Sequence, residues 1–334
     1  MGRMINKNIK LVEDIFNTKA LEHLATRDGF GKGVVEVGER DERIVVLCAD
    51  LAESTRSHWF KEKFPERFIE VGVAEQNLAT VAAGLAVYGK IPFITSYAAF
   101  SPGRNNEQIR TTISINDVPV KICGMHAGVS VGPDGATHQQ LEDIALMRAQ
   151  PNMVVIVPSD AEEARKAIVA TATNNRPTYL RFGRENTPVF TTEKTPFEIG
   201  KAIIVWESKD PQVVLIACGT LLYNALFAAQ ELMAEGIGTI VIDNHTIKPM
   251  DEDTIVSVAQ RVGAVVTVEE HQVMGGMGSA VAEVLARRYP VPIEFIGVQD
   301  QFGQSGTPEE LIEHYGMDVK SIKGAVKCVI NRKK

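Results

Sequence analysis

FIEVGVAEQN, residues 68–77, is the stretch that decides the fold of this chain. Its apolar first half, up to Val73, is typical of a buried strand, and a helix is predicted to begin at Glu75. The helix is so rich in small residues over positions 79–86 that it is expected to be buried as well. Ligands bind at the carboxyl ends of strands in an open α/β sheet, so Glu75 lies where a ligand is expected.

The chemistry of a carboxyl group at this junction has two interpretations. Burial without a partner favours the neutral form of a carboxyl group, which can hydrogen-bond a ligand ring nitrogen and exchange a proton with it. Alternatively, Glu75 only caps the helix, because acidic residues favour the first turn. The stretch alone leaves both interpretations open.

Composition limits the class of protein. The chain has 334 residues, of which 45% are hydrophobic and 23% charged, as in an ordinary globular protein of about two domains. A net charge of −7 argues against nucleic-acid binding, which needs a basic face. No apolar run approaches the roughly 18 residues that cross a bilayer, so no membrane association is expected.

The amino terminus and the cysteines indicate the compartment. Residues 1–7 lack the apolar core of a signal peptide. The four cysteines, Cys48, Cys123, Cys218 and Cys328, form no CxxC pair. Three of them lie in apolar strand-like runs and are expected to be buried thiols in a reducing compartment. A cytoplasmic location is therefore expected.

Strands and helices alternate along the first half of the chain. This alternation predicts an α/β fold with a mostly parallel sheet covered on both faces. Strands are expected at residues 43–48, 67–73, 91–95, 118–123, 153–157 and 178–180. Helices are expected at residues 18–40 (broken near Gly29, Gly31 and Gly33), 57–64, 75–88, 104–115, 138–149 and 161–173.

Residues 185–200 are predicted to be a domain linker, because periodicity is lost there and two prolines occur. A second α/β unit follows this linker. The chain is therefore expected to contain two α/β domains, residues 1–190 and 191–334. In the second, the glycines at 275, 276 and 278 precede a predicted helix. They could cradle an anion or form a tight turn, and their spacing is not the dinucleotide fingerprint.

Three loops, each after a predicted strand, carry polar side chains. The first contains Asp50 and Ser54, the second contains Glu75, and the third spans residues 126–138. A loop of that length without its own secondary structure is usually functional.

Two kinds of site fit the third loop. Its histidines, His126 and His138, and its aspartate, Asp134, are metal-ligand types, although zinc sites favour closer or helical spacing. Hydrogen bonding to a hydroxylated substrate fits the same side chains equally well.

Three motifs together resemble the transketolase family. They are VGVAEQN at 71–77, GPDGATHQ at 132–139, and PNM at 151–153 followed by VPSD at 157–160. Over residues 18–325 the chain resembles the carboxy-terminal half of a transketolase of the kind encoded as two separate subunits. The resemblance implies dependence on thiamine diphosphate, with a pyrimidine-binding domain followed by a carboxy-terminal domain that holds no cofactor.

The resemblance also implies roles for individual residues. Glu75 matches the catalytic glutamate that contacts the pyrimidine ring nitrogen. Tyr97 and Phe100 match aromatic residues packed around the aminopyrimidine, although they are equally typical of a core. Asp50 matches a residue that lines the cofactor pocket.

For the sugar substrate, the resemblance implies that His138 and Asp134 hydrogen-bond hydroxyl groups, and that His138 takes part in catalysis. Four residues match the clamp for the acceptor phosphate: Arg27, Ser54, His126 and Arg184. Arginine forks suit phosphate oxygens, although Arg184 could equally be a solvated surface charge. Pro133 stands where the family usually has an acid, so the substrate loop is the part whose specificity is open.

One family motif is missing from this chain. Family members bind the cofactor diphosphate and its Mg²⁺ with a Gly-Asp-Gly motif and a later asparagine, and this chain contains no Gly-Asp-Gly. The resemblance therefore implies an amino-terminal partner subunit that carries the diphosphate and metal site. It also implies a homodimer of this chain within a complex of two copies of each subunit, acting on sugar phosphates to transfer a two-carbon ketol unit.

Three other functions compete with this interpretation. A 1-deoxyxylulose-5-phosphate synthase shares the Ala-Glu-Gln and Asp-Gly-x-Thr-His elements, and the beta subunit of a 2-oxo acid dehydrogenase lacks the Thr-His loop. A non-catalytic assembly partner with the same fold is the third. The retention of Glu75 and of the clamp residues argues against a non-catalytic role.

Overall fold

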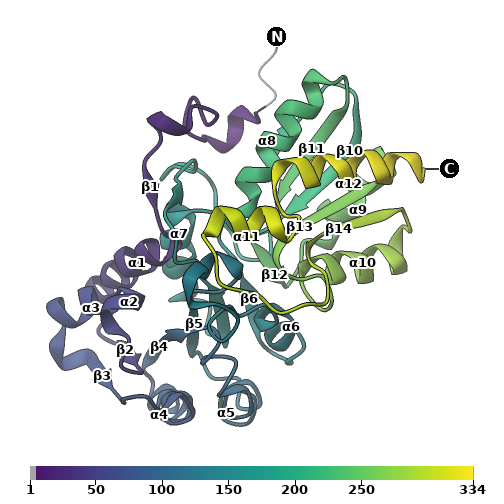
Figure 1. Cartoon of the computed structure of the whole chain (residues 1–334). Helices are drawn as coiled ribbons and strands as arrows, with labels where there is room; N and C mark the ends of the chain where they lie inside the picture. The colour runs from purple at the N-terminus through teal and green to yellow at the C-terminus, as the bar shows by residue number, and fades with distance from the viewer. Residues whose placement is uncertain (1–4, 334) are drawn as a thin grey trace.

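The computed structural model describes residues 5–333 and forms two α/β parts that lie side by side (Figure 1). Residues 1–4 and Lys334 lie outside the described part. The expectations for the amino terminus and for the outer ends of both domains therefore fall partly outside the described residues. Each part has one mostly parallel sheet with helices on both faces, which confirms the predicted α/β fold.

The first sheet has seven strands, in the order β12 (Thr246–Lys248), β6 (Val154–Ile156), β7 (Thr178–Arg181), β5 (Lys121–Met125), β4 (Ile91–Tyr97), β2 (Ile44–Cys48) and β3 (Phe68–Glu70). All neighbours run parallel except β12, which pairs antiparallel with β6. Successive side chains of β2 point to opposite faces, as the period of a strand requires. Ile44 and Val46 enter one apolar core, and Val45 and Leu47 enter another.

The helices of this part are α1 (Thr26–Arg40), α2 (Ala52–Thr55), α3 (His58–Lys63), α4 (Glu75–Val87), α5 (Asn106–Gln108), α6 (Asp143–Arg148) and α7 (Ala161–Thr171). Short 3₁₀ turns are η1 (Lys7–Ile9), η2 (Thr18–Ala20), η3 (Pro65–Arg67) and η5 (Val129–Asp134), and η4 (Ile109–Ser114) is a π-helical segment. The helix predicted at residues 104–115 is therefore a short α-helical turn followed by this π segment. The helix predicted at 138–149 begins only at Asp143.

The prediction of one broken helix over residues 18–40 is wrong in two respects. The α-helix begins at Thr26, and it runs without a break through its glycines. The glycines are needed because α7 and Trp59 approach closely: a Cβ at Gly29 would lie 2.0 Å from the Ala161 carbonyl oxygen, and one at Gly31 would lie 2.3 Å from the Trp59 ring. Close helix packing offsets their low helix propensity.

The second sheet has five strands, in the order β14 (Ile293–Val298), β13 (Val265–Gln272), β10 (Pro211–Ala217), β11 (Gly238–Asp243) and β9 (Ile203–Glu207), with only β9 antiparallel to its neighbour. Its helices are α8 (Leu221–Ala234), α9 (Glu252–Val262), α10 (Met277–Arg288), α11 (Pro308–His314) and α12 (Val319–Asn331). Strand β13 continues to Gln272. Glu269, Glu270 and His271 are therefore buried strand residues.

Two segments cross the expected division at residue 190. Strand β12, from the second half of the sequence, completes the edge of the first sheet. Near the amino terminus, Ile9 and Ile15 pack in the core of the second part, where the Tyr223 hydroxyl donates to the Ile15 carbonyl oxygen at 2.7 Å. The domain ranges 1–190 and 191–334 stay a prediction, because the two parts exchange segments.

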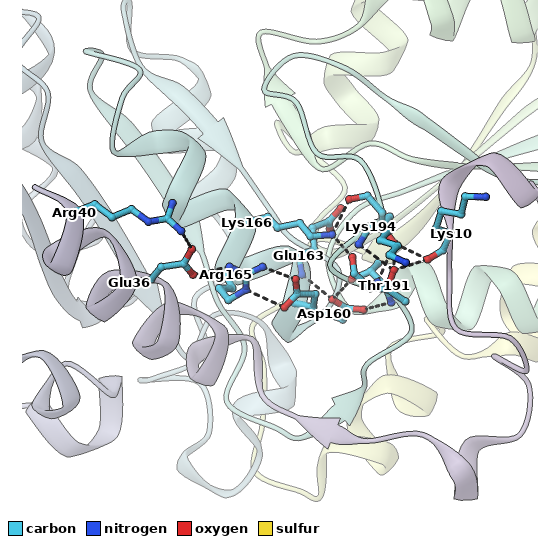
Figure 2. A network of polar contacts seen from close by, with 12 residues as sticks. Lys10, Glu36, Arg40, Asp160, Glu163, Arg165, Lys166, Thr191 and Lys194 are labelled. Carbon is cyan, nitrogen blue, oxygen red and sulfur yellow. Dashed lines mark hydrogen bonds and ion pairs between the residues drawn. The ribbon is translucent and has the colours of Figure 1, made fainter.

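The linker expected at residues 185–200 is fastened to the first part (Figure 2). It contributes β8 (Thr187–Pro188), which pairs with β1 (His23–Leu24). The buried Asp160 carboxylate at the start of α7 accepts hydrogen bonds from the backbone of Phe190 at 2.9 Å and of Thr191 at 2.7 Å. Lys166, six residues after Asp160 on α7, donates to the Thr195 carbonyl oxygen at 2.7 Å. The linker is thus held in place by α7.

The expectations for the cysteines and for membrane-spanning segments can be compared with the structure. Cys48, Cys123 and Cys218 are buried free thiols, as predicted, and Cys328 is exposed. Among residues 5–333, every helix is too short or too polar to cross a membrane.

Candidate functional site

Four neighbouring strands bring the polar loops together. In the sheet order β5-β4-β2-β3 the strands are parallel, so their carboxyl ends meet at one edge. The segments that leave this edge carry Asp50 after β2, Glu75 after β3, Phe100 after β4 and His126 after β5. The fold therefore gathers at one edge most of the residues that the sequence singled out.

Glu75 is the first residue of α4, and its side chain is only 1% exposed. Its carboxylate accepts hydrogen bonds from the Ser96 hydroxyl at 3.2 Å and from Arg104 Nη1 at 2.6 Å. The Asn105 side chain donates to the Glu75 backbone carbonyl oxygen at 2.9 Å. The carboxylate points toward these residues, and α4 has no side-chain cap, so helix capping does not explain Glu75. It is also not the unpartnered carboxyl group that the sequence allowed.

Arg104 was missed by the sequence reasoning. It lies on the segment after β4, its side chain is 46% exposed, and it forms an ion pair with Glu75. Its guanidinium carbon lies 4.6 Å from the centroid of the Phe100 ring. A flat cation thus stacks on an aromatic ring while donating to a buried carboxylate. The only sequence signal was its position four residues after Phe100.

An aromatic cluster lies beside this pair. The Tyr97 ring stacks on the His126 ring with centroids 4.1 Å apart and lies 5.9 Å from the Phe100 ring. His138 meets the edge of Phe100 at 5.4 Å and that of Tyr97 at 6.1 Å. The structure therefore joins the two predicted aromatic residues to both predicted histidines.

Arg27 and His126 form the centre of the predicted phosphate clamp. Arg27 Nη1 donates to the Ser54 carbonyl oxygen at 2.9 Å and lies 2.8 Å from His126 Nε2. Because a guanidinium only donates, Nε2 must be the acceptor, which places the imidazole proton on Nδ1. His126 Nδ1 and Arg27 Nε are buried without a hydrogen-bond partner in the described chain. Both are donors that an anionic ligand could use.

The charge state of His126 follows from its surroundings. Burial, and then the positive charges of Arg27 and Arg184, lower the pKa of His126 to about 3. Burial, and then the nearby Arg56, also lower the pKa of Arg27. His126 is therefore neutral over the physiological range, while Arg27 keeps its charge because a guanidinium starts from so high a pKa.

Arg184 approaches the same region from the segment after β7. Its Nη1 donates to the Val131 carbonyl oxygen at 2.9 Å and lies 3.4 Å from Asp134 Oδ2. His138 Nδ1 lies 2.9 Å from the Thr137 hydroxyl oxygen. Arg184 is thus tied to the loop that carries Asp134, and it is more than an isolated surface charge.

The side chains of two predicted site residues, Ser54 and Asp50, make no described contact with the other predicted site residues. The Ser54 hydroxyl makes no described contact with Arg27, which instead binds the Ser54 carbonyl oxygen. Asp50 is exposed, with a left-handed φ of 59°, and its backbone N–H donates to Glu70 Oε1 at 2.8 Å. The described contacts do not bring the Asp50 carboxylate to Glu75 or to the aromatic cluster. The same Glu70 oxygen also accepts from the Gly72 N–H at 2.9 Å, so Glu70 connects the loop after β2 with the loop before α4. The sequence reasoning did not assign Glu70 a role in the site.

The glycines before α10 surround a side chain of the chain itself. Glu269 accepts hydrogen bonds from the Met277 N–H at 2.7 Å and from the Gly278 N–H at 2.8 Å. A Cβ at Gly276 would lie 2.3 Å from the Glu269 carboxylate. Burial raises the pKa of Glu269 to about 7. Of the two interpretations of these glycines, the structural one accounts for these contacts.

Two further features surround the site. In the described part of the chain, no three His, Cys, Asp or Glu side chains are grouped as metal ligands. A cavity of about 400 Å³ lies between the two α/β parts, and Gly183 and Glu185, on either side of Arg184, are among its lining residues. Glu75 does not line this cavity, whereas Ser130 of the loop at residues 126–138 does.

Comparison with known proteins identifies the two parts. Residues 22–189 match the pyrimidine-binding domain of transketolase, and residues 200–322 match the transketolase C-terminal domain. A protein assigned as a transketolase C-terminal section from Methanocaldococcus jannaschii is 44% identical over 89% of this chain and 93% of its own length. A 6-deoxy-6-sulfo-D-fructose transketolase subunit from a Clostridium species is 39% identical over 95% of this chain and 98% of its own length.

Longer relatives and solved structures agree with this picture. Rat transketolase is 36% identical over 95% of this chain, which spans 51% of that protein. A solved split-gene transketolase, described as an inactive beta4 tetramer, has a TM-score of 0.87 and 44% identity, and covers 93% of this chain and 100% of its own.

Proposed function

This chain belongs to the transketolase family, and we propose that it is the carboxy-terminal subunit of a two-subunit transketolase that transfers a two-carbon ketol unit from a ketose phosphate to an aldose phosphate. The observation that carries the proposal is the buried Glu75 carboxylate at the sheet edge, beside Phe100 and the aromatic cluster. The family is dependent on thiamine diphosphate.

The residues of this chain fit the pyrimidine ring of that cofactor. A flat, nitrogen-rich group already stacks on Phe100 and binds Glu75 here, namely the Arg104 guanidinium. A ring nitrogen can take the same hydrogen bond to Glu75, and Phe100 and Tyr97 can pack on the ring. When bound, thiamine diphosphate supplies the carbon nucleophile that carries the two-carbon unit.

The proposed roles of the other residues follow from their chemistry. Glu75 exchanges a proton with the pyrimidine ring nitrogen. Near it, His138 and Asp134 hydrogen-bond sugar hydroxyl groups, and His138 moves a proton on the substrate. Arg27 and Arg184 bind the acceptor phosphate, with donors from His126 and Ser54 completing the clamp. Asp50 lines the cofactor pocket from the first loop.

Two observations support the need for a partner subunit. This chain has no Gly-Asp-Gly, so the proposed Mg²⁺ and diphosphate ligands must come from an amino-terminal subunit. Apolar side chains are exposed at both ends of α4: Val73, just before Glu75, is 72% exposed, and Tyr88, at the far end of the helix, is 91% exposed. The expectation that α4 is buried holds for only one face of the helix in the single chain, because the opposite face is exposed. An apolar face of this kind marks a protein interface.

We further propose the assembly and the place of action. Two copies of this chain associate and bind two amino-terminal subunits, each pair forming active sites for sugar phosphates, in the cytoplasm. The sulfonated sugar in the name of the Clostridium relative has an anionic tetrahedral group like a phosphate. The arginines of the clamp would suit either group. We propose a phosphorylated sugar as the substrate, and a sulfonated sugar serves as the comparison in the assay.

The function is tested by reconstitution. The chain is purified alone and with a partner of transketolase type that carries Gly-Asp-Gly, and ketol transfer is measured with phosphorylated, sulfonated and uncharged sugars. The pair is expected to be active with thiamine diphosphate and Mg²⁺, and the chain alone to be inactive and to bind the cofactor weakly. Full activity of the lone chain, or none from any well-assembled pair, would overturn the proposal.

A further inference from the structure

The loop at residues 126–138, here called the substrate loop, is anchored by the residue that follows it. Gln139 is buried, and its side-chain Nε2 donates to the Val129 carbonyl oxygen at 3.0 Å and to the Gly132 carbonyl oxygen at 3.1 Å. The same nitrogen donates to the Gln304 carbonyl oxygen at 3.0 Å. Two of these acceptors belong to the substrate loop, and the third belongs to the second α/β part.

The orientation of this amide is determined by its surroundings. Three carbonyl oxygens converge on one end of the Gln139 side chain, and only the NH₂ group can face them. The amide oxygen, Oε1, is left buried without a hydrogen-bond partner in the described chain. An unpaired buried acceptor is destabilising, so this arrangement persists only because the packing and the two N–H hydrogens, shared among three carbonyl oxygens, hold it.

The segment 303–306, between β14 and α11, is shaped to receive Gln139 and the loop. A Cβ at Gly303 would lie 1.8 Å from Gln139 Oε1. On the loop side, a Cβ at Gly132 would lie 3.3 Å from the Gly306 carbonyl oxygen, and one at Gly135 would lie 2.8 Å from the Ser305 hydroxyl. Glycines on both sides therefore allow the two backbones to approach closely.

This contact lies directly beside the proposed sugar-binding residues. His138 precedes Gln139 in the chain, and Asp134 lies between the two glycines of the loop. The Gly132 carbonyl oxygen that Gln139 binds is two residues before Asp134. Any shift of the 303–306 segment would therefore move the backbone that carries both residues.

We propose that Gln139 is a positioning residue through which segment 303–306 of the second α/β part holds the substrate loop in its sugar-binding geometry. The inference rests on the proposed function for its kinetic consequence. It gives the carboxy-terminal part, which is expected to hold no cofactor, a definite task in substrate recognition. Gln139 itself is buried, so in this proposal it acts only through the loop.

The test uses one variant on each side of the contact. Gly303→Ala inserts a methyl group against Gln139, and the Gly303 backbone is not left-handed, so alanine meets no backbone strain there. Gln139→Ala removes the NH₂ group, whose two hydrogens are shared among the three carbonyl oxygens. The matched control is Gly324→Ala on α12, where an added Cβ meets nothing within 4 Å. The double variant Gly303→Ala with Gln139→Ala removes the side chain that the new methyl group would meet.

Two measurements are made on the full chain and on the reconstituted complex. In the chain alone, amide hydrogen exchange over residues 129–138 should rise at least about threefold in both single variants and stay unchanged in the control. In the complex, the KM for the sugar acceptor should rise about three- to tenfold, while thiamine diphosphate affinity stays within about twofold of the parent. The double variant should be no worse than Gln139→Ala alone, because the Gly303 effect acts through Gln139.

The outcomes separate this inference from the proposed function. Unchanged exchange in both single variants would show that the contact does not hold the loop. Raised exchange with an unchanged KM, or a loss of cofactor affinity equal to the rise in KM, would overturn the positioning role. If the parent complex transfers no ketol unit, the proposed function fails, and the exchange data alone decide whether segment 303–306 holds the loop.

Discussion

Arg104 and Glu75 form an ion pair in which Arg104 Nη1 lies 2.6 Å from Glu75 Oε2. The carboxylate is buried, and the guanidinium is half-exposed and stacked on Phe100. In the free chain the arginine thus holds the hydrogen-bonding position that the proposed function gives to a ring nitrogen. A ligand that takes this hydrogen-bonding position on Glu75 would displace Arg104. Substitution of either residue therefore tests the ion pair.

Glu75→Gln should leave the fold intact and abolish most ketol transfer. The amide keeps the size and the hydrogen bond from Arg104 to an oxygen, but it cannot exchange a proton with the ring nitrogen. Turnover of the reconstituted complex should fall by at least about a hundredfold. The matched control is Glu66→Gln, whose side chain is largely exposed. Turnover within about threefold of the parent would exclude the acid–base role.

Arg104→Met should lower the stability of the isolated chain, because it leaves the buried Glu75 without its cation. Loss of a charge-assisted hydrogen bond costs about 1–2 kcal/mol here, discounted because Arg104 is half-exposed. The midpoint of thermal unfolding should fall by a few degrees, and adding Glu75→Gln should restore part of it. Arg110→Met, at the exposed second residue of η4, serves as control. An unchanged midpoint would show that the pair contributes nothing.

Arg27→Ala and Arg184→Ala should raise the KM for phosphorylated acceptors far more than for uncharged ones. A charge-assisted contact to phosphate is worth roughly 1.5–3 kcal/mol, or about ten- to a hundredfold in KM. Both arginines also bind backbone carbonyl oxygens of the site, so a small general loss is expected for every acceptor. Equal penalties for charged and uncharged acceptors would contradict the clamp, and Arg110→Ala gives the surface-charge baseline.

His126 should make the chain less stable as the pH falls. Its pKa is lowered to about 3 in the folded chain, chiefly by burial, whereas an unfolded histidine titrates near 6.5. Between these values the unfolded chain binds a proton that the folded chain does not, so the contribution is full above about pH 6.5 and is lost progressively toward pH 3.

The measurement is thermal unfolding across that range. His126→Gln should flatten the decline between about pH 6.5 and pH 4, whereas His314→Gln at an exposed position should not. His271, whose pKa burial lowers to about 4, adds a decline of the same sign that persists in both variants. An identical pH profile for the parent and His126→Gln would refute the assignment of a buried neutral imidazole.

The sequence by itself determined the alternation of strands and helices and the strand-to-helix junction at Glu75. These are local features, because hydrophobic periodicity records which face of each segment is buried. The motifs at 71–77 and 132–139 also indicated the family, which the comparisons confirmed. The prediction of a broken helix at residues 18–40 was wrong. Low helix propensity of glycine predicts a break, but propensity contains no information on the close packing of neighbouring helices that requires these glycines.

Only the tertiary structure decided which distant groups meet. Arg104 reaches Glu75 across 29 residues, Gln139 reaches Gln304 across 165, and β12 joins a sheet formed mainly by the first half of the chain. Such contacts depend on the crossover connections and on the packing of whole elements, and no window of the sequence contains both partners. The sequence therefore named the residues at the edge of the sheet, and the fold determined their partners.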